Sequence, residues 1–309
     1  MSVVIEKPKK KNHIRSGSLV ADVLIYALLA FLSIIFIYPL YQVIVNSISD
    51  PAVVATRNGL LLWPTGIQFD AYRVVFRNKN LWTGFKNTLV YMVLGTSLQY
   101  FVTLITAYAL SLKDLRFKKG LMIYFTVTMY FGGGIIPYFL LITRLGLMNS
   151  MWVLIIPQAC NVWNIILMRT QFVNLPGELK EAATIDGAGD VTMLFRIMLP
   201  LSGAVSAVLI LFTAVGYWNM WFDPMIYLTK RSMYPLQSVM REILIDNAAV
   251  AKAGAAGSNV KINRDVNQAA VNALIKYANI VVSTVPILCV YPFAQKYFVK
   301  GALVGSLKG

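Results

Sequence analysis

Residue types that perform covalent chemistry are scarce in this chain of 309 residues. A hydrolase or transferase needs a nucleophile beside a base, or a set of metal ligands, but the one histidine, His13, stands in a basic N-terminal segment. Cys160 and Cys289 lie inside apolar segments and are interpreted as small core residues. The patterns GxSxG, HExxH and GxxxxGK followed by Ser or Thr do not occur. The chain is therefore predicted not to be an enzyme, and ATP hydrolysis must occur on another subunit if ATP is the energy source.

Neutral polar side chains that could hydrogen-bond a solute stand inside the apolar segments. Gln99 and Thr103, for example, are four residues apart and so share one face of a helix. The candidate pathway residues are Gln99, Thr103, Asn161, Asn164, Ser206, Thr213, Tyr217, Asn279 and Ser283. With aromatic residues such as Trp163 and Trp218 near them, this set would suit sugar hydroxyls and the apolar faces of sugar rings. The alternative is that these residues hold the helices together, because packed membrane helices use the same residue types.

Ionisable groups are not found near the middle of the apolar segments. Asp22, Arg169 and Lys276 all lie near segment ends, whereas a transporter coupled to protons or sodium usually carries such groups deep in its spans. A channel is disfavoured as well, because there is no charged ring or repeated filter loop.

The composition is that of an integral membrane protein. Hydrophobic residues make up 58% of the chain and charged residues 13%, against about 25% charged in soluble domains, and mean hydropathy is +0.64. The net charge of +15 could indicate nucleic acid, but the basic residues gather at the termini and in loops, where they flank membrane segments. We therefore expect contact with lipid and no nucleic-acid partner.

Six apolar segments approach the length of about 20 residues that crosses a bilayer as a helix. They are residues 19–45, 87–111, 120–142, 151–168, 201–222 and 273–299. The first is too long for a signal peptide and lacks a small-residue cleavage site, so it is predicted to be a retained span. The fold expected is all-α, with six transmembrane helices and both termini in the cytoplasm.

The domain organisation follows from these spans. A basic cytoplasmic tail covers residues 1–18, the six-helix membrane domain residues 19–300, and a cytoplasmic tail residues 301–309. Within the membrane domain, residues 46–86 and 223–272 are outer loops and residues 169–200 form a long cytoplasmic loop. The positive-inside rule agrees with a basic N-terminus and with the basic loop at 112–119, but the first outer loop is basic too. Arg73, Arg77, Lys79 and Lys86 are among its basic residues.

The third segment is interrupted by Gly132, Gly133, Gly134 and Pro137. Such residues allow either close packing of helices or local unwinding, and transporters use broken helices at binding sites. We favour a tight packing contact, because glycine and proline are common in membrane helices.

The cytoplasmic stretch at residues 181–200 changes from polar to apolar along its length. A helix is predicted to start at Pro176, which suits a first turn, with Glu178 near the positive end of the dipole. Gly187 is predicted to be a hinge after this helix, and Asp190 the N-cap of a second helix that ends where Pro200 opens the fifth span. The small side chains beside Glu181 would leave a flat surface on which another protein could dock.

Seven residues at fixed spacing resemble the EAA motif of permease subunits in ATP-binding-cassette importers. They are Glu181, Ala182, Ala183, Gly187, Ile197, Leu199 and Pro200. The resemblance extends over nearly the whole chain and is closest to the carbohydrate-uptake group, in particular the smaller maltose-type permease and the oligosaccharide and lipoprotein-operon permeases. Residues 216–219, 234–237, 291–293 and 301–309 support it by their order and spacing. The outer loop at 248–267 departs from the pattern, because it is longer than in the maltose-type subunit.

The resemblance implies a type I importer permease fold with cytoplasmic coupling helices. Residues 169–200, here named the coupling loop, would dock on a cytoplasmic ATPase through Glu181, Asp186 and their neighbours, and the tail residues Gly305, Lys308 and Gly309 would reach the same interface. A second homologous permease, two copies of the ATPase and an extracellular or periplasmic solute-binding protein are implied as partners. ATP and Mg²⁺ would bind the ATPase, and no cofactor is expected in this chain.

The function implied is one half of the translocation pathway for a carbohydrate, an oligosaccharide or a sugar derivative, in the bacterial cell (inner) membrane. The alternatives are a permease of the same kind for a non-sugar solute and, less favoured, a secondary transporter.

Overall fold

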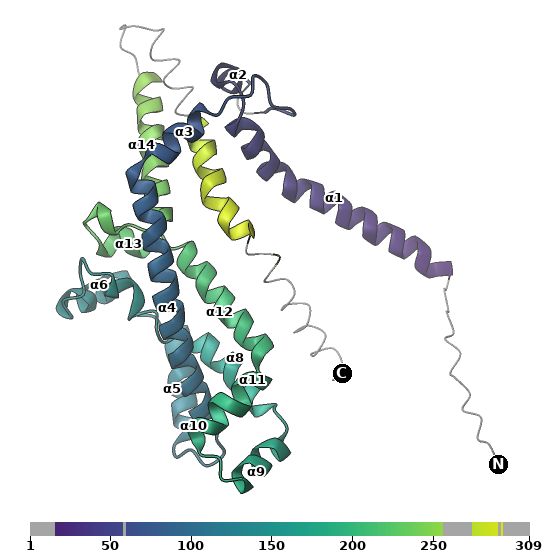
Figure 1. Cartoon of the computed structure of the whole chain (residues 1–309), viewed down its shortest axis with the longest axis vertical. Helices are drawn as coiled ribbons and strands as arrows, with labels where there is room; N and C mark the ends of the chain where they lie inside the picture. Colours follow the sequence, from purple (N-terminus) through teal and green to yellow (C-terminus); the bar gives the residue numbers. More distant parts are fainter. Residues whose placement is uncertain (1–15, 58–59, 256–273, 290–291, 293–309) are drawn as a thin grey trace.

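The computed structural model describes residues 16–57, 60–255, 274–289 and 292, and these residues form helices and connecting loops (Figure 1). The helices are α1 (Ser16–Ser47), α2 (Pro51–Thr56), α3 (Asp70–Arg77), α4 (Lys79–Ser111), α5 (Lys118–Tyr130), α6 (Ile135–Arg144), α7 (Trp152–Ile155), α8 (Val162–Val173), α9 (Gly177–Ile185), α10 (Asp190–Thr192), a π-helical turn (Met193–Met198), α11 (Leu199–Leu201), α12 (Gly203–Trp218), α13 (Phe222–Tyr227), a 3₁₀ turn (Arg231–Met233) and α14 (Leu236–Ala255). A further apolar helix covers Leu274–Cys289.

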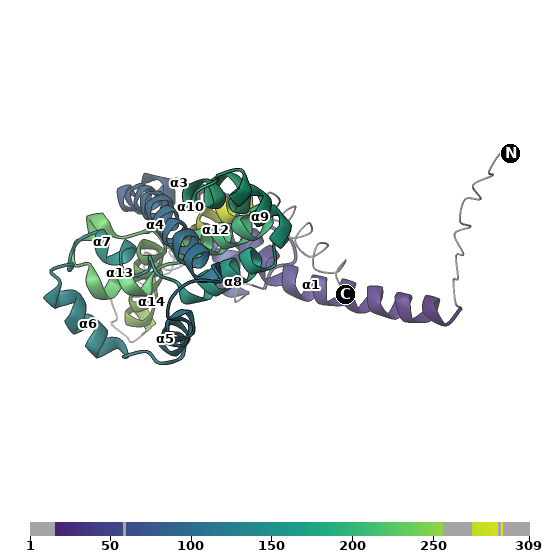
Figure 2. The same cartoon turned by 90° about the horizontal axis from the view of Figure 1, so that it is seen from below.

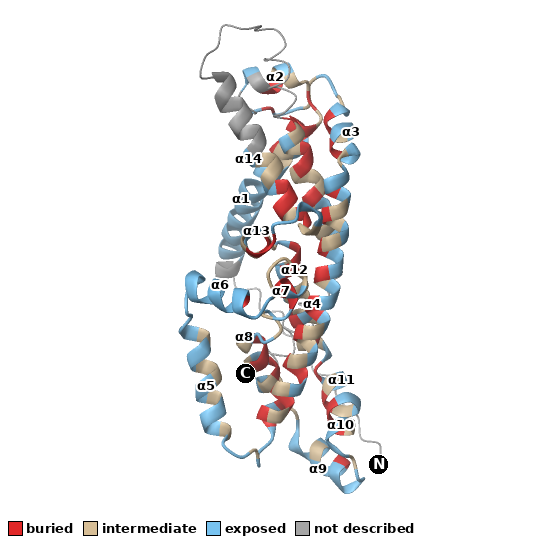
Figure 3. Cartoon of the chain, turned by 90° about the vertical axis from the view of Figure 1, so that its left-hand side faces the viewer, coloured by how far each residue is buried: buried red, intermediate tan, exposed pale blue. Residues whose placement is uncertain are grey.

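Helix α4 is the central element of the molecule. It has no proline or internal break, and its N-cap is Asn78, whose side chain accepts a 3.0 Å hydrogen bond from the backbone N–H of Asn80. It packs against α8, α12 and α14, and Figure 3 shows buried residues along much of its length. Because α4 starts at Lys79, the helix extends eight residues beyond the predicted start of the second span and includes the end of the predicted first outer loop.

Three clusters of buried apolar side chains follow one another along α4. Leu81 belongs to a cluster with α3, α14 and the helix Leu274–Cys289, and Tyr91 to a second cluster with α7 and α13. Leu104 and Ala107 belong to the third, with α8 and the coupling loop. One helix therefore connects the end of the molecule that carries α2 and α3 with the end that carries α9 and α10 (Figure 1).

Helix α1 projects from the rest of the chain. Figures 1 and 2 show it leaving the bundle at an angle, and the most apolar 18-residue window within Leu19–Ser47 has no buried residue. Near its end, Val45 joins the cluster that contains Leu81. A helix with apolar side chains on all sides is stable in lipid or against another apolar helix.

Of the described residues, two helices are long and apolar enough to cross a membrane, or up to four when two bent pairs each count as one span. The continuous helices are Leu19–Ser47 and Lys79–Ser111. The bent pairs are α5 with α6, at 112°, and Asp190–Leu201 with α12, at 85°. The described residues therefore do not form six continuous spans. Which side of the membrane each loop faces stays a prediction.

The breaks correct two expectations from the sequence. The third segment unwinds at residues 131–134, and a Cβ added to Gly132 or Gly134 would meet nothing within 4 Å, so glycine is not needed there for packing within this chain. The fourth segment, predicted as one span, is two helices separated by residues 156–161. Pro157 stands in that interval, where it cannot donate a backbone hydrogen bond.

Candidate coupling loop and translocation cavity

Helix α9 ends in two hydrogen bonds that fix the turn after it. The backbone N–H of Gly187 donates to the carbonyl of Thr184 at 3.1 Å, and that of Ala188 to the carbonyl of Ala183 at 2.9 Å. Gly187 has φ of +80°, and this pattern with a left-handed glycine is a Schellman C-cap. The predicted hinge at Gly187 is therefore a defined helix cap, closed by two hydrogen bonds. Pro176, predicted in the first turn, is instead the N-cap before Gly177, and Glu178 lies in the first turn as predicted.

The second helix of the coupling loop, α10, begins one residue earlier in the sequence than predicted. The N-cap of α10 is Gly189, and Asp190, predicted as the cap, is the first helical residue. Its carboxylate accepts a 2.6 Å hydrogen bond from the hydroxyl of Tyr108 on α4. Leu194 and Met198 are buried at the helical spacing expected of them, and Ile197 and Leu199 pack partly against the same cluster.

The EAA residues do not all lie on the exposed surface. Glu181, Ala182, Asp186 and Pro200 are exposed, whereas Ala183 is 9% exposed and packs with Met193 and Leu194 inside the chain. Ala183 thus does not fit the flat docking surface expected from the sequence. Two apolar side chains within the coupling loop are far more exposed, Ile185 at 85% and Val191 at 73%. They belong to α9 and α10, at the end of the molecule away from α2 and α3 (Figure 1).

Two basic side chains tie the coupling loop and α8 to their neighbours. Nζ of Lys180 donates a 2.7 Å hydrogen bond to the carbonyl of Phe172, and Nε of Arg169 donates at 3.0 Å to the carbonyl of Leu110 at the end of α4. Burial, with the nearby charges of Lys113 and Lys118, lowers the pKa of Lys180 from its ordinary value. The charges of Lys113 and Lys118 therefore repel the protonated amine of Lys180.

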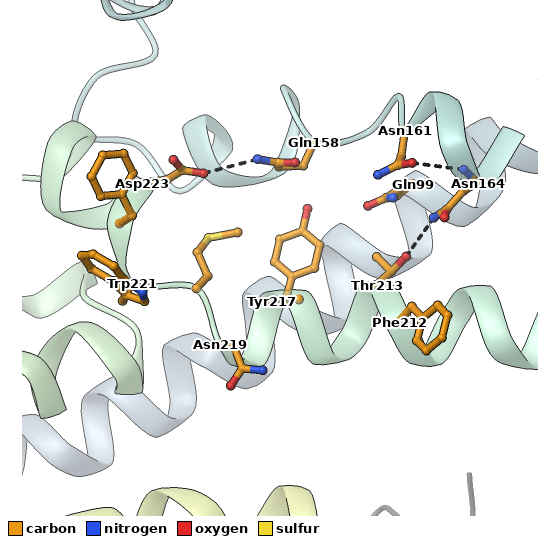
Figure 4. A pocket seen from close by; sticks show the side chains of 13 residues that line it. Gln99, Gln158, Asn161, Asn164, Phe212, Thr213, Tyr217, Asn219, Trp221 and Asp223 are labelled. Atoms are coloured by element: carbon orange, nitrogen blue, oxygen red, sulfur yellow. Dashed lines mark hydrogen bonds between the residues drawn. The ribbon is translucent and has the colours of Figure 1, made fainter. Parts of the chain in front are cut away.

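A polar cavity of about 370 Å³ opens between α4, α12 and the break that separates α7 from α8 (Figure 4). Amides, hydroxyls and aromatic rings make up most of its lining. It is lined by Gln99, Gln158, Asn161, Asn164, Phe212, Thr213, Gly216, Tyr217, Asn219, Met220, Trp221, Phe222 and Asp223. Five of the nine predicted pathway residues are therefore brought together. They are Gln99, Asn161, Asn164, Thr213 and Tyr217.

Hydrogen bonds hold the polar groups of the cavity in place. Oδ1 of Asn161 accepts from the backbone N–H of Asn164 at 3.1 Å and so caps α8, while Nδ2 of Asn164 donates to the hydroxyl of Thr213 at 3.2 Å. At the other end, Nε2 of Gln158 donates to Oδ2 of Asp223 at 3.3 Å. Figure 4 shows the side chain of Tyr217 between these two groups.

The ring of Tyr217 packs directly against a glycine of α4. A Cβ added at Gly95 would stand 2.1 Å from Cζ of Tyr217, so only glycine leaves room for the ring. The tyrosine hydroxyl donates to the carbonyl of Leu154 in α7 at 3.3 Å. One side chain therefore joins α12, α4 and α7 at the wall of the cavity.

Asp223 is the one acidic residue of the lining, and the lining includes no lysine, arginine or histidine. It lies in the first turn of α13 and is half-buried. Burial raises the pKa of its carboxyl group, and the hydrogen bond from Gln158 acts in the opposite direction.

Four predicted pathway residues lie away from this cavity. Thr103, Ser206, Asn279 and Ser283 are each buried elsewhere in the bundle. The carbonyl of Ser283 accepts a 3.3 Å hydrogen bond from Nε1 of Trp218. The hydroxyl of Ser283 itself donates to the carbonyl of Ile280 in its own helix at 3.1 Å, so the side chain is buried and bonded within the bundle, as the helix-packing alternative expects.

The two tryptophans that were expected near the pathway residues do not line the cavity. Trp163 is 56% exposed and Trp218 is buried in the cluster around Leu81, and neither lines the cavity. Sequence reasoning missed Asn219 and Trp221, which stand inside the predicted fifth span, and Asp223, which was assigned to the outer loop after it. The available signal was the sequence YWNMWFD at 217–223, in which two pairs of aromatic residues are each followed by a polar residue. The tail residues Gly305, Lys308 and Gly309 and most of the predicted insertion at 248–267 lie outside the described residues.

Comparison with known proteins identifies the class of molecule. No family model matches the chain. It is 38% identical over 288 residues to the polygalacturonan/rhamnogalacturonan transport system permease protein YtcP of Bacillus subtilis (strain 168), covering 93% of this chain and 98% of that protein. It is 36% identical over 299 residues to protein LplC of the same organism, covering 96% and 98%.

Among solved structures, the chain is similar to a subunit of a bacterial ATP-binding-cassette transporter involved in the import of the acidic polysaccharide alginate. The TM-score is 0.78 at 31% identity, over 94% of this chain and all of that one. The chain belongs to the permease subunits of ATP-binding-cassette importers for sugars and oligosaccharides. Members of this family are membrane transport subunits and not enzymes, which confirms the resemblance seen in the sequence.

Proposed function

We propose that the cavity beside Tyr217 is this chain's half of the pathway for an oligosaccharide, and that the coupling loop connects it to a cytoplasmic ATPase. The observation that carries the proposal is that α4 takes part in both sites. Gln99 lines the cavity, and Tyr108, nine residues further along the same helix, donates to Asp190 in the coupling loop.

The lining of the cavity suits a saccharide. Amide and hydroxyl groups offer donors and acceptors to sugar hydroxyls, and the rings of Phe212, Trp221 and Phe222 offer flat apolar surfaces. The relatives named for polygalacturonan/rhamnogalacturonan and alginate support a saccharide over a non-sugar solute.

The exposed surface of the coupling loop suits a protein partner. Ile185 and Val191 stand among exposed polar groups that include Glu181, an arrangement expected where a protein groove closes over a short helix. In the proposed complex, this chain pairs with a second homologous permease, two copies of the ATPase bind below, and a solute-binding protein delivers the cargo. Six spans with both termini in the cytoplasm would place the coupling loop on the ATPase side.

The mechanism proposed is alternating access. ATP binding closes the two ATPases, the coupling loops follow, and the contacts from Asp190 to Tyr108 and from Lys180 to Phe172 transmit the movement to α4 and α8. These helices carry Gln99 and Asn164, so the cavity changes its access as they rotate.

Purification from the native membrane tests the assembly. A tagged chain is expected to carry a second permease and an ATPase, whereas a stable homodimer without either would contradict the proposal. Glu181→Ala in the purified complex is then expected to lower transport-linked ATPase activity. Glu178→Ala, an exposed glutamate on the same helix, is the matched control. Equal effects of the two substitutions would exclude a specific role for Glu181.

A further inference from the structure

We propose that a second cavity, at the α3 end of the bundle, binds an acyl chain of an anionic phospholipid. It has a volume of about 430 Å³ and lies between α3, the first turns of α4, the start of α14 and the helix Leu274–Cys289 (Figure 1). It is lined by Tyr72, Phe76, Leu81, Trp82, Phe85, Leu236, Val281, Val282, Val285 and Pro286. The two cavities share no lining residue, so this site is separate from the proposed pathway.

The lining offers hydrocarbon and aromatic rings, and its two polar side-chain groups are already bonded within the chain. Nε1 of Trp82 donates to the carbonyl of Phe76 at 2.9 Å, and the hydroxyl of Tyr72 shares a 2.7 Å hydrogen bond with that of Ser47. A sugar or a peptide entering this cavity would lose hydrogen bonds to water and regain few of them. An acyl chain loses none, so the cavity suits a lipid tail.

The cavity opens at the surface of the bundle. The side chains of Phe76, Trp82 and Val285 line it and are about half exposed. Tryptophan and tyrosine gather where a bilayer meets water, and both residue types stand in this lining. A lipid tail can therefore enter from the adjoining leaflet while its headgroup stays at the level of the interface.

Basic side chains beside the cavity supply the charge that selects the headgroup. Lys79 and Lys86 stand three residues before and four residues after Trp82, so they share its face of α4. Both are exposed, as is Arg77 at the end of α3, and α4 contains no acidic residue. Among the described residues, no carboxylate forms an ion pair with any of the three. They can therefore attract a phospholipid headgroup that carries a net negative charge.

This site also accounts for a departure from the positive-inside rule. The first outer loop of the predicted topology is basic, although basic residues are expected mainly on the cytoplasmic side. Three of its basic residues, Arg77, Lys79 and Lys86, belong to the two helices that wall the cavity. Binding of an anionic headgroup gives these charges a role at an outer surface.

The test uses the complete transporter in lipid nanodiscs of phosphatidylcholine. Two photoactivatable probes carry the same diazirine-labelled acyl chain and differ only in the headgroup, which is phosphatidylglycerol or phosphatidylcholine. After illumination, mass spectrometry locates the labelled peptides. The phosphatidylglycerol probe is expected to label the peptides that contain Phe76 and Val282 and to saturate at a low fraction of probe. The phosphatidylcholine probe should label them only in proportion to its fraction.

Two pairs of variants separate the site from the surrounding lipid. Val285→Trp fills the cavity and is expected to abolish the saturable labelling. Leu288→Trp, at an exposed position of the same helix outside the lining, should leave it unchanged. Lys79→Gln is expected to lower the preference for phosphatidylglycerol by about fivefold. Lys119→Gln, an exposed lysine at the start of α5, is the control with the same change of charge.

Three results would overturn the proposal. The first is equal labelling by the two probes, or equal effects of the two lysine variants, which would exclude selection by charge. The second is saturable labelling that persists in Val285→Trp, which would place the lipid elsewhere. The third is the absence of label from the cavity peptides, the result expected if the second permease covers this surface.

Discussion

The hydroxyl of Tyr108 on α4 donates a 2.6 Å hydrogen bond to the carboxylate of Asp190 at the start of α10. The ring of Tyr108 is buried in the same cluster as Leu194 and Met198, so the contact joins two packed elements and is not a mobile surface pair. It links the coupling loop to the helix that carries Gln99 at the cavity.

Removing this hydroxyl with Tyr108→Phe is expected to weaken the link without creating a cavity. The loss is expected to be about 1 kcal/mol of coupling energy between the two residues, measured as a double-mutant cycle with Asp190→Asn on thermal unfolding of the complex. The amount of solute transported per ATP should fall as well. Tyr124→Phe on the exposed face of α5 is the control. Additive effects of Tyr108→Phe and Asp190→Asn would show that the hydrogen bond carries no energy.

Gly187→Val is expected to disturb the Schellman cap by backbone strain. A Cβ at Gly187 would meet nothing within 4 Å, but φ of +80° is unfavourable for a residue with a side chain, at a cost of about 1–2 kcal/mol. The expected result is an assembled complex with poor coupling between ATP hydrolysis and import. Gly189→Val, at φ of −76° and also in open space, provides the comparison. Normal import by the Gly187→Val complex would remove the role assigned to this cap.

Gly95→Ala is expected to displace the ring of Tyr217. The added methyl group would stand 2.1 Å from Cζ, so either α12 or the ring must move, and overpacking of this kind costs about 1–3 kcal/mol. Thermal unfolding should report the loss, and sugar binding should weaken because Tyr217 lines the cavity. Gly203→Ala, in open space on α12, should be harmless. The second variant Tyr217→Leu should restore stability to Gly95→Ala; a failure to do so would place the cause elsewhere.

Lys113→Gln is expected to stabilise the protein at neutral pH. The pKa of Lys180 is lowered by burial and by the charges of Lys113 and Lys118, so the folded state disfavours the charged amine. The unfolded chain then binds more protons, and stability rises with pH between the lowered pKa and the ordinary value of 10.5. Removing the charge of Lys113 should raise the stability at pH values below this range. It should also make the increase of stability with pH smaller within the range. The measurement is the unfolding midpoint against pH, with Lys119→Gln as the control; identical curves for the two variants would contradict the assigned cause.

Local patterns were sufficient for the parts of the molecule that depend on neighbouring residues. Hydrophobic runs predicted the first two long helices, because a helix in lipid satisfies its own backbone hydrogen bonds. The spacing from Glu181 to Pro200 predicted a helix, a glycine break and a second helical piece. What it could not place was the side chain of Asp190, since its partner Tyr108 is 82 residues away in the sequence.

The sequence by itself thus determined the membrane class, the family and the helix, glycine turn and helix of residues 177–198, because composition and short motifs record these features directly. Only the tertiary structure decided which polar residues form the cavity. Polar groups that line a pathway and those that hold helices together have the same chemistry, so Asn164 and Ser283 cannot be distinguished by type or spacing. Three features form the cavity, namely the break at Pro157, the close approach of Tyr217 to Gly95 and the position of Asp223 at the start of α13. Each of them depends on packing between segments that are distant in the sequence.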